Sequence, residues 1–262
     1  IGNAVGGSSG AMLFFLISLA MNFFSYYYSD KVAIKMTGSQ PVSEEEAPQL
    51  YAIVRQLSQR AGIPMPRIYI TPSPQPNAFA TGRNPSNSAI AVTEGLLQIL
   101  NKEELAGVLA HEIAHIKNRD VLIGTVAATF AGAISMIANV IQWGAMFGMG
   151  RSDEEGGGGS LLGGLLLAII APIAAMIIQM SISRSREYTA DESGARVAGS
   201  ARGLASALLK LQSAAQRIPM EVNPSASHLF IVHPLSGSSI ANLFSTHPPI
   251  EDRVRRLNEL RI

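Results

Sequence analysis

Residues 111–115 read His-Glu-Ile-Ala-His, a set of side chains that can bind a metal ion and use it for hydrolysis. Residues four apart on an α-helix lie on one face, so the imidazoles of His111 and His115 can reach the same ion. Glu112 is turned toward the neighbouring position, where a water molecule on that ion would lie. A carboxylate there can accept a proton from the water as it attacks a peptide carbonyl. The spacing therefore predicts metal-assisted peptide hydrolysis, with Glu112 as the general base.

The residues around this motif predict the helix that it needs. Asn101 and Glu104 have the spacing of a capping box, in which each side chain accepts a hydrogen bond from the other residue's backbone N–H. An apolar stripe at helical spacing follows, formed by Leu105, Val108, Leu109, Ile113 and Ile116. The five-residue motif alone arises by chance in about one chain per hundred of this length. A helix with two surface histidines is the alternative interpretation, and the capped amphipathic helix argues against it.

Zinc requires a third protein ligand and an open fourth position for hydrolysis. A motif with a third histidine would have Gly at 118 and His at 121, but the sequence has Asn118 and Val121. The chain contains no cysteine, so only a histidine elsewhere or a carboxylate can complete the site, and we expect a carboxylate. The best candidate is Glu187, with Asp191 one helical turn further on, where it could orient a ligand histidine. The same spacing also fits a solvated helix face, so the pattern leaves both interpretations open.

The composition indicates contact with lipid. Hydrophobic residues make up 47% of the chain and charged residues only 15%, below the usual quarter for soluble domains. Uncharged apolar stretches at 11–28, 121–150 and about 161–182 have the length of membrane spans, and tyrosines close the first. Buried core helices of a soluble protein are the alternative. The net charge of +1 gives no reason to expect a nucleic-acid partner.

The distribution of cations predicts how the spans are oriented. Cations flank the spans at Lys31, Lys35, Lys117, Arg119, Arg184 and Arg186. The connector between the second and third spans has Arg151 alone, beside three acidic residues at 153–155. By the positive-inside rule, this connector lies outside and the polar segments face the cytoplasm.

The polar segments predict one α+β domain, mostly helical with a small sheet. A capping box of Ser43 and Glu46 predicts a helix that reaches Ala61. Alternating residues predict strands at 67–71, 77–81 and 89–93. We therefore expect an N-terminal transmembrane segment at 1–30, a cytoplasmic protease domain formed by 31–120 and 183–262, and a transmembrane helical hairpin at 121–182.

Several motifs match one known family: HEIAHIKNRD before the apolar pair, SRSREYTADESGA after it, and NAFATG, AVTEGLL and STHPPIEDRVRRL elsewhere. Over nearly the whole chain, the sequence resembles the HtpX family of integral-membrane zinc metalloproteases, relatives of the CAAX prenyl proteases. The resemblance implies a gluzincin-type domain with one zinc ion held by His111, His115 and Glu187. It also implies cleavage of misfolded or damaged membrane proteins, in quality control at a bacterial or archaeal cell membrane.

The resemblance further implies roles for residues whose pattern alone is ambiguous. Asn77, Ala78 and Phe79 would belong to an edge strand beside the metal, where an unfolded substrate adds itself by backbone pairing. His247 and Arg253 would face the scissile carbonyl and stabilise the oxyanion. The pattern alone fits an ordinary turn and strand at the first place, and a helix start at the second.

The family usually carries two apolar segments before the catalytic domain, whereas this chain has one and begins with Ile1. We therefore expect an earlier segment to be missing from it.

Two other functions fit part of the sequence: a non-catalytic membrane protein with a structural metal site, and a prenyl-protein protease. A closed fourth ligand would mark the first function. The second requires a large enclosed chamber, for which three spans are too few.

Overall fold

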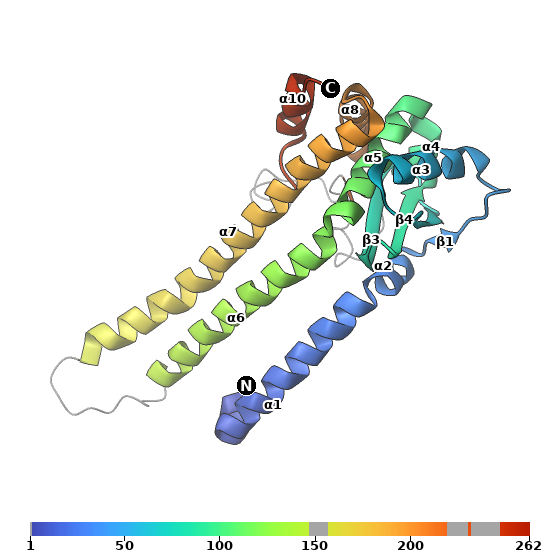
Figure 1. Ribbon diagram of the computed structural model, residues 1–262. Coiled ribbons are helices and arrows are strands. Elements are labelled where there is room, and N and C mark those ends of the chain that lie inside the picture. The colour runs from blue at the N-terminus through green and yellow to red at the C-terminus, as the bar shows by residue number, and fades with distance from the viewer. Residues whose placement is uncertain (1, 147–156, 219–229, 232–246) are drawn as a thin grey trace. The chain divides into compact units, whose positions relative to one another are not determined.

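The structure is a computed structural model that describes residues 2–146, 157–218, 230–231 and 247–262. The chain divides into two compact units, one formed by Ile1–Leu122 and Arg184–Ile262, the other by Ile123–Ser183. The first unit contains the sheet and every residue predicted to belong to the site (Figure 1). The predicted fold class, a mostly helical domain with a small sheet, is confirmed.

Four strands form one mixed sheet in the order β1, β2, β4, β3. Their bounds are β1 Gln40–Pro41, β2 Arg67–Thr71, β3 Ala78–Asn84 and β4 Asn87–Thr93. β2 runs parallel to β4, whereas β3 pairs with β4 antiparallel and places Ala78 opposite Val92. The three predicted strands are present, and β3 lies at an edge of the sheet as expected. β1 was not predicted, because two residues are too few to show an alternating pattern.

Helix α3 (Pro48–Ala61) corrects one prediction about where a helix begins. The side chains and backbones of Ser43 and Glu46 exchange the expected hydrogen bonds, at 2.7 and 3.3 Å. These bonds close a separate turn, and the helix itself begins at Pro48. The residue before a proline is kept out of the helical region, and Ala47 has φ −136°. A proline at the first helical position is favourable, so the helix begins there.

Helix α5 (Lys102–Asn118) is the centre of the core, and it packs against α3, α8 (Arg202–Ala215) and β3. Its start is fixed by the predicted capping box, with hydrogen bonds of 2.9 and 3.0 Å between Asn101 and Glu104. Each residue of the predicted apolar stripe is buried. Burial of one such aliphatic side chain contributes roughly 1.5–3 kcal/mol. A short helix α4 (Glu94–Ile99), capped by the Thr93 hydroxyl, joins β4 to α5.

Close contact between α5 and α7 (Gly157–Ala198) depends on Gly194. A Cβ atom at this position would lie 2.9 Å from both the Cα and the backbone N of His111. Such distances are shorter than van der Waals contact, so only glycine permits this approach. The glycine therefore brings the helix of the predicted third ligand against the helix of the two histidines.

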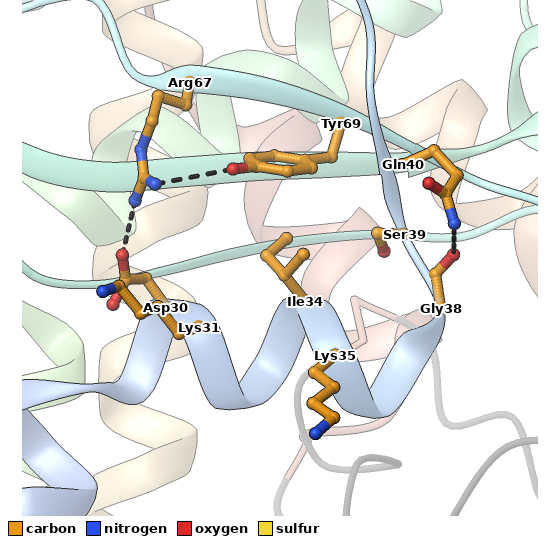
Figure 2. A pocket seen from close by; sticks show the side chains of 9 residues that line it. All are labelled: Asp30, Lys31, Ile34, Lys35, Gly38, Ser39, Gln40, Arg67 and Tyr69. Carbon is orange, nitrogen blue, oxygen red and sulfur yellow. Dashed lines mark hydrogen bonds and ion pairs between the residues drawn. The ribbon is translucent and has the colours of Figure 1, made fainter.

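Helix α2 (Ser29–Thr37), which follows α1 (Gly2–Tyr27), is attached to the sheet by an ion pair. Arg67 on β2 donates a hydrogen bond to Asp30 Oδ2 at 2.5 Å and another to the Tyr69 hydroxyl at 3.4 Å. Figure 2 shows these contacts in a pocket of about 370 Å³ that lies between α2 and the strands. The residues that line this pocket do not include any side chain of the predicted metal site.

Two long helices correspond to the second and third predicted apolar stretches. Helix α6 is Asp120–Met146, and α7 continues without a break from Gly157 to Ala198, with Pro172 inside it. Glu187 therefore lies within α7 and not between a span and a separate helix. Within the described residues, no helix is both long enough and apolar enough to pass through a membrane. The connector with Arg151, used to predict orientation, falls outside the described residues.

Candidate metal centre

His111, His115 and Glu187 come together although they belong to two different helices. The Nε2 atoms of the two histidines on α5 are 3.0 Å apart. Glu187 on α7 places one carboxylate oxygen 3.6 Å from His111 Nε2 and the other 3.6 Å from His115 Nε2. These three side chains form the group, among the described residues, whose ligand atoms are close enough to share an ion.

The three distances fit a small tetrahedral cation. Zinc binds nitrogen and oxygen at about 2.0–2.2 Å, which places two ligand atoms of a tetrahedron about 3.3–3.5 Å apart. The separations of 3.0 and 3.6 Å lie on both sides of this value. The Oε2 atom of Glu187 is also buried without a hydrogen-bond partner among the described residues. A buried carboxylate whose two oxygens each lie near one imidazole is a suitable ligand for a metal.

Asp191 lies one turn after Glu187 on α7 and contacts the first histidine. Its Oδ1 atom is 2.9 Å from His111 Nδ1, which leaves His111 Nε2 directed to Glu187. Burial opposes ionisation of Asp191, but the charge of Arg253 and the hydrogen bonds from Arg253 and His111 outweigh it and hold its pKa below the usual value. The carboxylate is therefore ionised, as a hydrogen-bond acceptor for a ligand histidine must be.

Asp120 plays the corresponding part for the second histidine, and sequence reasoning missed it. Its Oδ2 atom is 2.7 Å from His115 Nδ1, and Arg186 donates to its other oxygen at 2.5 Å. Helix α5 ends at Asn118, its C-cap Arg119 has a left-handed φ of 57°, and α6 begins at Asp120. This reversal returns the carboxylate to the histidine. The signal available in the sequence was an acidic residue five positions after the second histidine.

The charges around the site keep His115 protonated in the absence of a cation. Burial alone would lower its pKa, but the hydrogen bond to Asp120 and the negative charges of Glu187, Glu112 and Asp120 raise the pKa to about 9. Burial likewise acts to raise the pKa of Glu187, and the positive charges of His247 and Arg253 hold it well below the usual value. A metal ion would take the place of the proton on His115.

Glu112 is buried on the same helix as the two histidines. Burial raises the pKa of its carboxyl, with a further contribution from the charge of Glu187. The positive charges of His111, His115 and Arg253 act in the opposite direction but do not cancel the effect of burial. A carboxyl whose pKa is displaced toward neutrality can accept and release a proton, as general base catalysis requires.

Arg253 on α10 (Ile250–Glu259) is completely buried behind the ligands. Its Nε and Nη2 atoms donate to the two oxygens of Asp191 at 2.8 and 2.6 Å. Its Nη1 atom lies 3.3 Å from Glu187 Oε2 and donates to the Ile231 carbonyl, also at 3.3 Å. His247 lies near the other carboxylate oxygen of Glu187, with Nδ1 3.4 Å from Oε1. Both residues therefore lie at the third ligand, and their predicted role at the oxyanion remains a prediction.

The predicted substrate-binding residues lie at the start of the edge strand. The backbone N–H of Asn77 donates to the Thr93 hydroxyl at 2.8 Å, and its side-chain oxygen accepts from the N–H of Ala78 at 3.1 Å. Ala78 and Phe79 are the first two residues of β3, and all three residues are buried. Their contact with a substrate remains a prediction.

Three comparisons relate the chain to known proteins. The sequence model of peptidase family M48 matches residues 44–261. A protease HtpX homolog of Pelotomaculum thermopropionicum is 76% identical over 100% of this chain and 93% of its own length. A protease HtpX homolog of Syntrophobacter fumaroxidans is 59% identical over 99% and 93%. The crystal structure of S. mikatae Ste24p shares the fold, with a TM-score of 0.65 and 19% identity over 98% of this chain and 60% of that chain.

Proposed function

Because the chain belongs to peptidase family M48, we propose that it is a zinc-dependent endopeptidase of a membrane that cleaves misfolded or damaged membrane proteins. The observation that carries this proposal is the convergence of His111, His115 and Glu187 on one point, with the buried Glu112 on the same helix as the histidines. Two imidazoles and one carboxylate form a ligand set that zinc takes in hydrolases, where the fourth position stays open.

The residues of the site divide the chemistry among them. When bound, zinc supplies a Lewis acid that lowers the pKa of water to about 7 and polarises the peptide carbonyl. Glu112 takes a proton from the attacking water and passes it to the nitrogen of the leaving peptide. Its raised pKa suits both transfers. Asp191 and Asp120 accept hydrogen bonds from the Nδ1 atoms of His111 and His115, so that each Nε2 is the ligand atom.

The two predicted oxyanion residues are not equivalent in their surroundings. The guanidinium of Arg253 already donates to Asp191 and to the Ile231 carbonyl, and it balances the charge of Glu187. His247 is 11% exposed at its side chain and lies near Glu187 Oε1, the oxygen that Arg253 does not contact. We therefore assign oxyanion stabilisation to His247, and to Arg253 the task of holding the two carboxylates in place.

Exposed apolar side chains support a place in a membrane. Along α1 the exposed large hydrophobic residues include Met12, Leu13, Leu16, Ile17, Leu19, Met21, Phe23 and Phe24. At the end of this helix, the Arg83 guanidinium lies 4.1 Å from the ring centre of Tyr27, and Lys31 lies over Tyr28. Aromatic rings next to cations are typical of the interface between lipid and water. With the proposed orientation, in which the cations beside the spans face the cytoplasm, the catalytic residues would lie on the cytoplasmic side.

The proposal can be tested by cleavage of casein, an unfolded substrate, by the detergent-solubilised protein. We expect cleavage that a chelator stops and added zinc restores. Glu112→Gln should bind zinc at one ion per chain and cleave about 100- to 10,000-fold more slowly, because the proton acceptor is lost. Glu103→Gln, a change at an exposed position of the same helix, is the control and should cleave at the unchanged rate. Unimpaired cleavage by Glu112→Gln would remove Glu112 from this role.

A further inference from the structure

The edge strand β3 already has a partner on its open side. Backbone groups of successive strand residues alternate between the two sides, and the Asn77 carbonyl accepts from Thr93 on β4. The Ala78 carbonyl therefore points away from β4, to the side where a further strand can add. At this place the backbone N–H of Ile231 donates to the Ala78 carbonyl at 3.1 Å. The chain itself thus makes the backbone contact that β-augmentation by a peptide requires.

The neighbouring residue, Phe230, occupies an aromatic site beside the same strand. Its side chain is completely buried and meets Phe79 edge to face, with ring centres 5.3 Å apart at an angle of 80°. Ala33 from α2 and Ala91 from β4 belong to the same buried cluster, and Ile34 and Tyr69 pack against it. These apolar side chains from α2, β2, β3 and β4 surround the Phe230 ring, and such surroundings suit an aromatic side chain.

The same two-residue segment also reaches the metal ligands. The Ile231 carbonyl accepts from Arg253 Nη1 at 3.3 Å, and this nitrogen is also 3.3 Å from Glu187 Oε2. One guanidinium therefore separates the Ile231 backbone from the third ligand. A peptide that pairs with β3 and extends toward the metal would have to use the space that Ile231 fills.

We propose that Phe230 and Ile231 are an internal occupant of the substrate groove, which a substrate displaces when it binds. Ile231 makes the backbone hydrogen bond at Ala78 that a substrate would make, and Phe230 fills a subsite that takes an aromatic side chain of the substrate. This inference rests on the proposed function, because it assumes that substrates pair with β3. Two consequences follow: the free enzyme is partly self-inhibited, and peptides with an aromatic residue are preferred.

The test measures peptide binding apart from cleavage. In the Glu112→Gln protein, the dissociation constant of a fluorescent peptide containing one phenylalanine is measured by anisotropy, next to a matched peptide with alanine there. Ile231→Pro removes the N–H that donates to Ala78 and should tighten binding about two- to tenfold, the value of one hydrogen bond. Ile231→Ala keeps the N–H but loses a buried side chain, so the part of the effect that is due to the hydrogen bond is the excess of Ile231→Pro over Ile231→Ala. Phe230→Ala empties the aromatic subsite and should tighten binding of the phenylalanine peptide more than that of the alanine peptide.

Other outcomes are distinguishable. Weaker or unchanged binding by Ile231→Pro and Phe230→Ala, each shown by circular dichroism to be folded at the assay temperature, would overturn the inference and would mean that the segment serves only to hold Arg253 in place. Phe230→Ala decides the question if Ile231→Pro does not fold. Failure of the proposed function is a separate result, since it shows as the absence of casein cleavage by the zinc-loaded protein with Glu112 intact, whatever the peptide affinities.

Discussion

The carboxylate of Asp120 lies 2.7 Å from Nδ1 of His115, across the point where α5 ends and α6 begins. Because Arg119 between the helices is left-handed, the chain turns back on the last residues of α5. The hydrogen bond to Asp120 determines which nitrogen of His115 faces Glu187. A carboxylate that accepts a hydrogen bond from a ligand histidine raises the basicity of the imidazole and fixes the orientation of its ring.

Loss of this carboxylate should weaken zinc binding without removing a ligand. We expect Asp120→Asn to lower zinc affinity about 10- to 100-fold, because the amide is a poorer acceptor and leaves Arg186 without its charge partner. The measurement is competition for zinc with a chromophoric chelator. Asp252→Asn, which removes an exposed ion pair with Arg255, serves as the control. Equal affinities in the two variants would show that Asp120 does not orient His115.

The third ligand has a direct test in metal content. Glu187→Ala should lose stoichiometric zinc, because two imidazoles alone do not complete the site. Zinc per chain is measured by atomic emission after gel filtration in zinc-free buffer. Glu192→Ala, a little more than one helical turn further along α7 in an exposed ion pair with Arg196, should keep one ion per chain. Full zinc occupancy in Glu187→Ala would mean that another residue is the third ligand.

Glu104 should make stability depend on pH in the acid range. Burial acts to raise its pKa, but hydrogen bonds from Lys210, Ser206 and the Asn101 backbone outweigh it and hold the pKa below the usual value. A depressed folded-state pKa contributes stability above the unfolded value of about 4.3, and this contribution is lost as pH falls through the folded value. The thermal unfolding midpoint should therefore drop between about pH 5 and pH 3.

The variant Glu104→Gln isolates this contribution. Glutamine can still form the capping box with Asn101, but it lacks the charge that pairs with Lys210 at 2.8 Å. We expect the variant to be less stable at pH 7 by about 1–3 kcal/mol, and the difference from the parent to shrink as pH falls below 4. A difference that stays constant from pH 7 to pH 3 would contradict the assignment.

Gly194 allows α7 to pack closely on α5 and should therefore affect both the stability of the protein and its affinity for zinc. In Gly194→Ala the added Cβ meets the backbone of His111 at 2.9 Å, so the helices must move apart. We expect a loss of about 1–3 kcal/mol in unfolding free energy, as for other overpacked positions, together with weaker zinc binding. Gly124→Ala is the matched control, because nothing lies within 4 Å of its added Cβ. Equal stability and zinc affinity in both variants would show that α7 does not need this close approach.

Features set by local residues could be predicted from the sequence. The capping box at Asn101, the apolar stripe of α5 and the spacing of His111 and His115 each depend on neighbours within a few residues, and the structure confirms that helix. The strands are present for the same reason. The beginning of α3 was wrong because two local signals compete, and Pro48 prevails over the capping box at Ser43.

Features that depend on distant contacts could not be obtained in this way. Spacing alone left Glu187 between a ligand and a solvated residue, because burial of its carboxylate results from packing of α7 on α5. Asp120 was missed because its approach to His115 depends on the left-handed backbone of Arg119. Arginine rarely adopts a positive φ, so its presence does not predict such a turn. The hydrogen bond between Ile231 and Ala78 joins segments that are far apart in the sequence, so no periodic pattern of residues predicts it.

The left-handed turn at Arg119 also has a consequence for the order of folding. His111, His115 and the orienting Asp120 lie within one short stretch, so they can come together as soon as α5 and the turn have formed. Glu187 reaches the two histidines only when a distant part of the chain closes a long loop. Closing this loop is slower than forming α5 and the turn, because more chain entropy must be lost. We therefore expect a nascent chain to hold a two-histidine half-site first, with weak affinity for zinc, and to gain its full affinity when α7 docks.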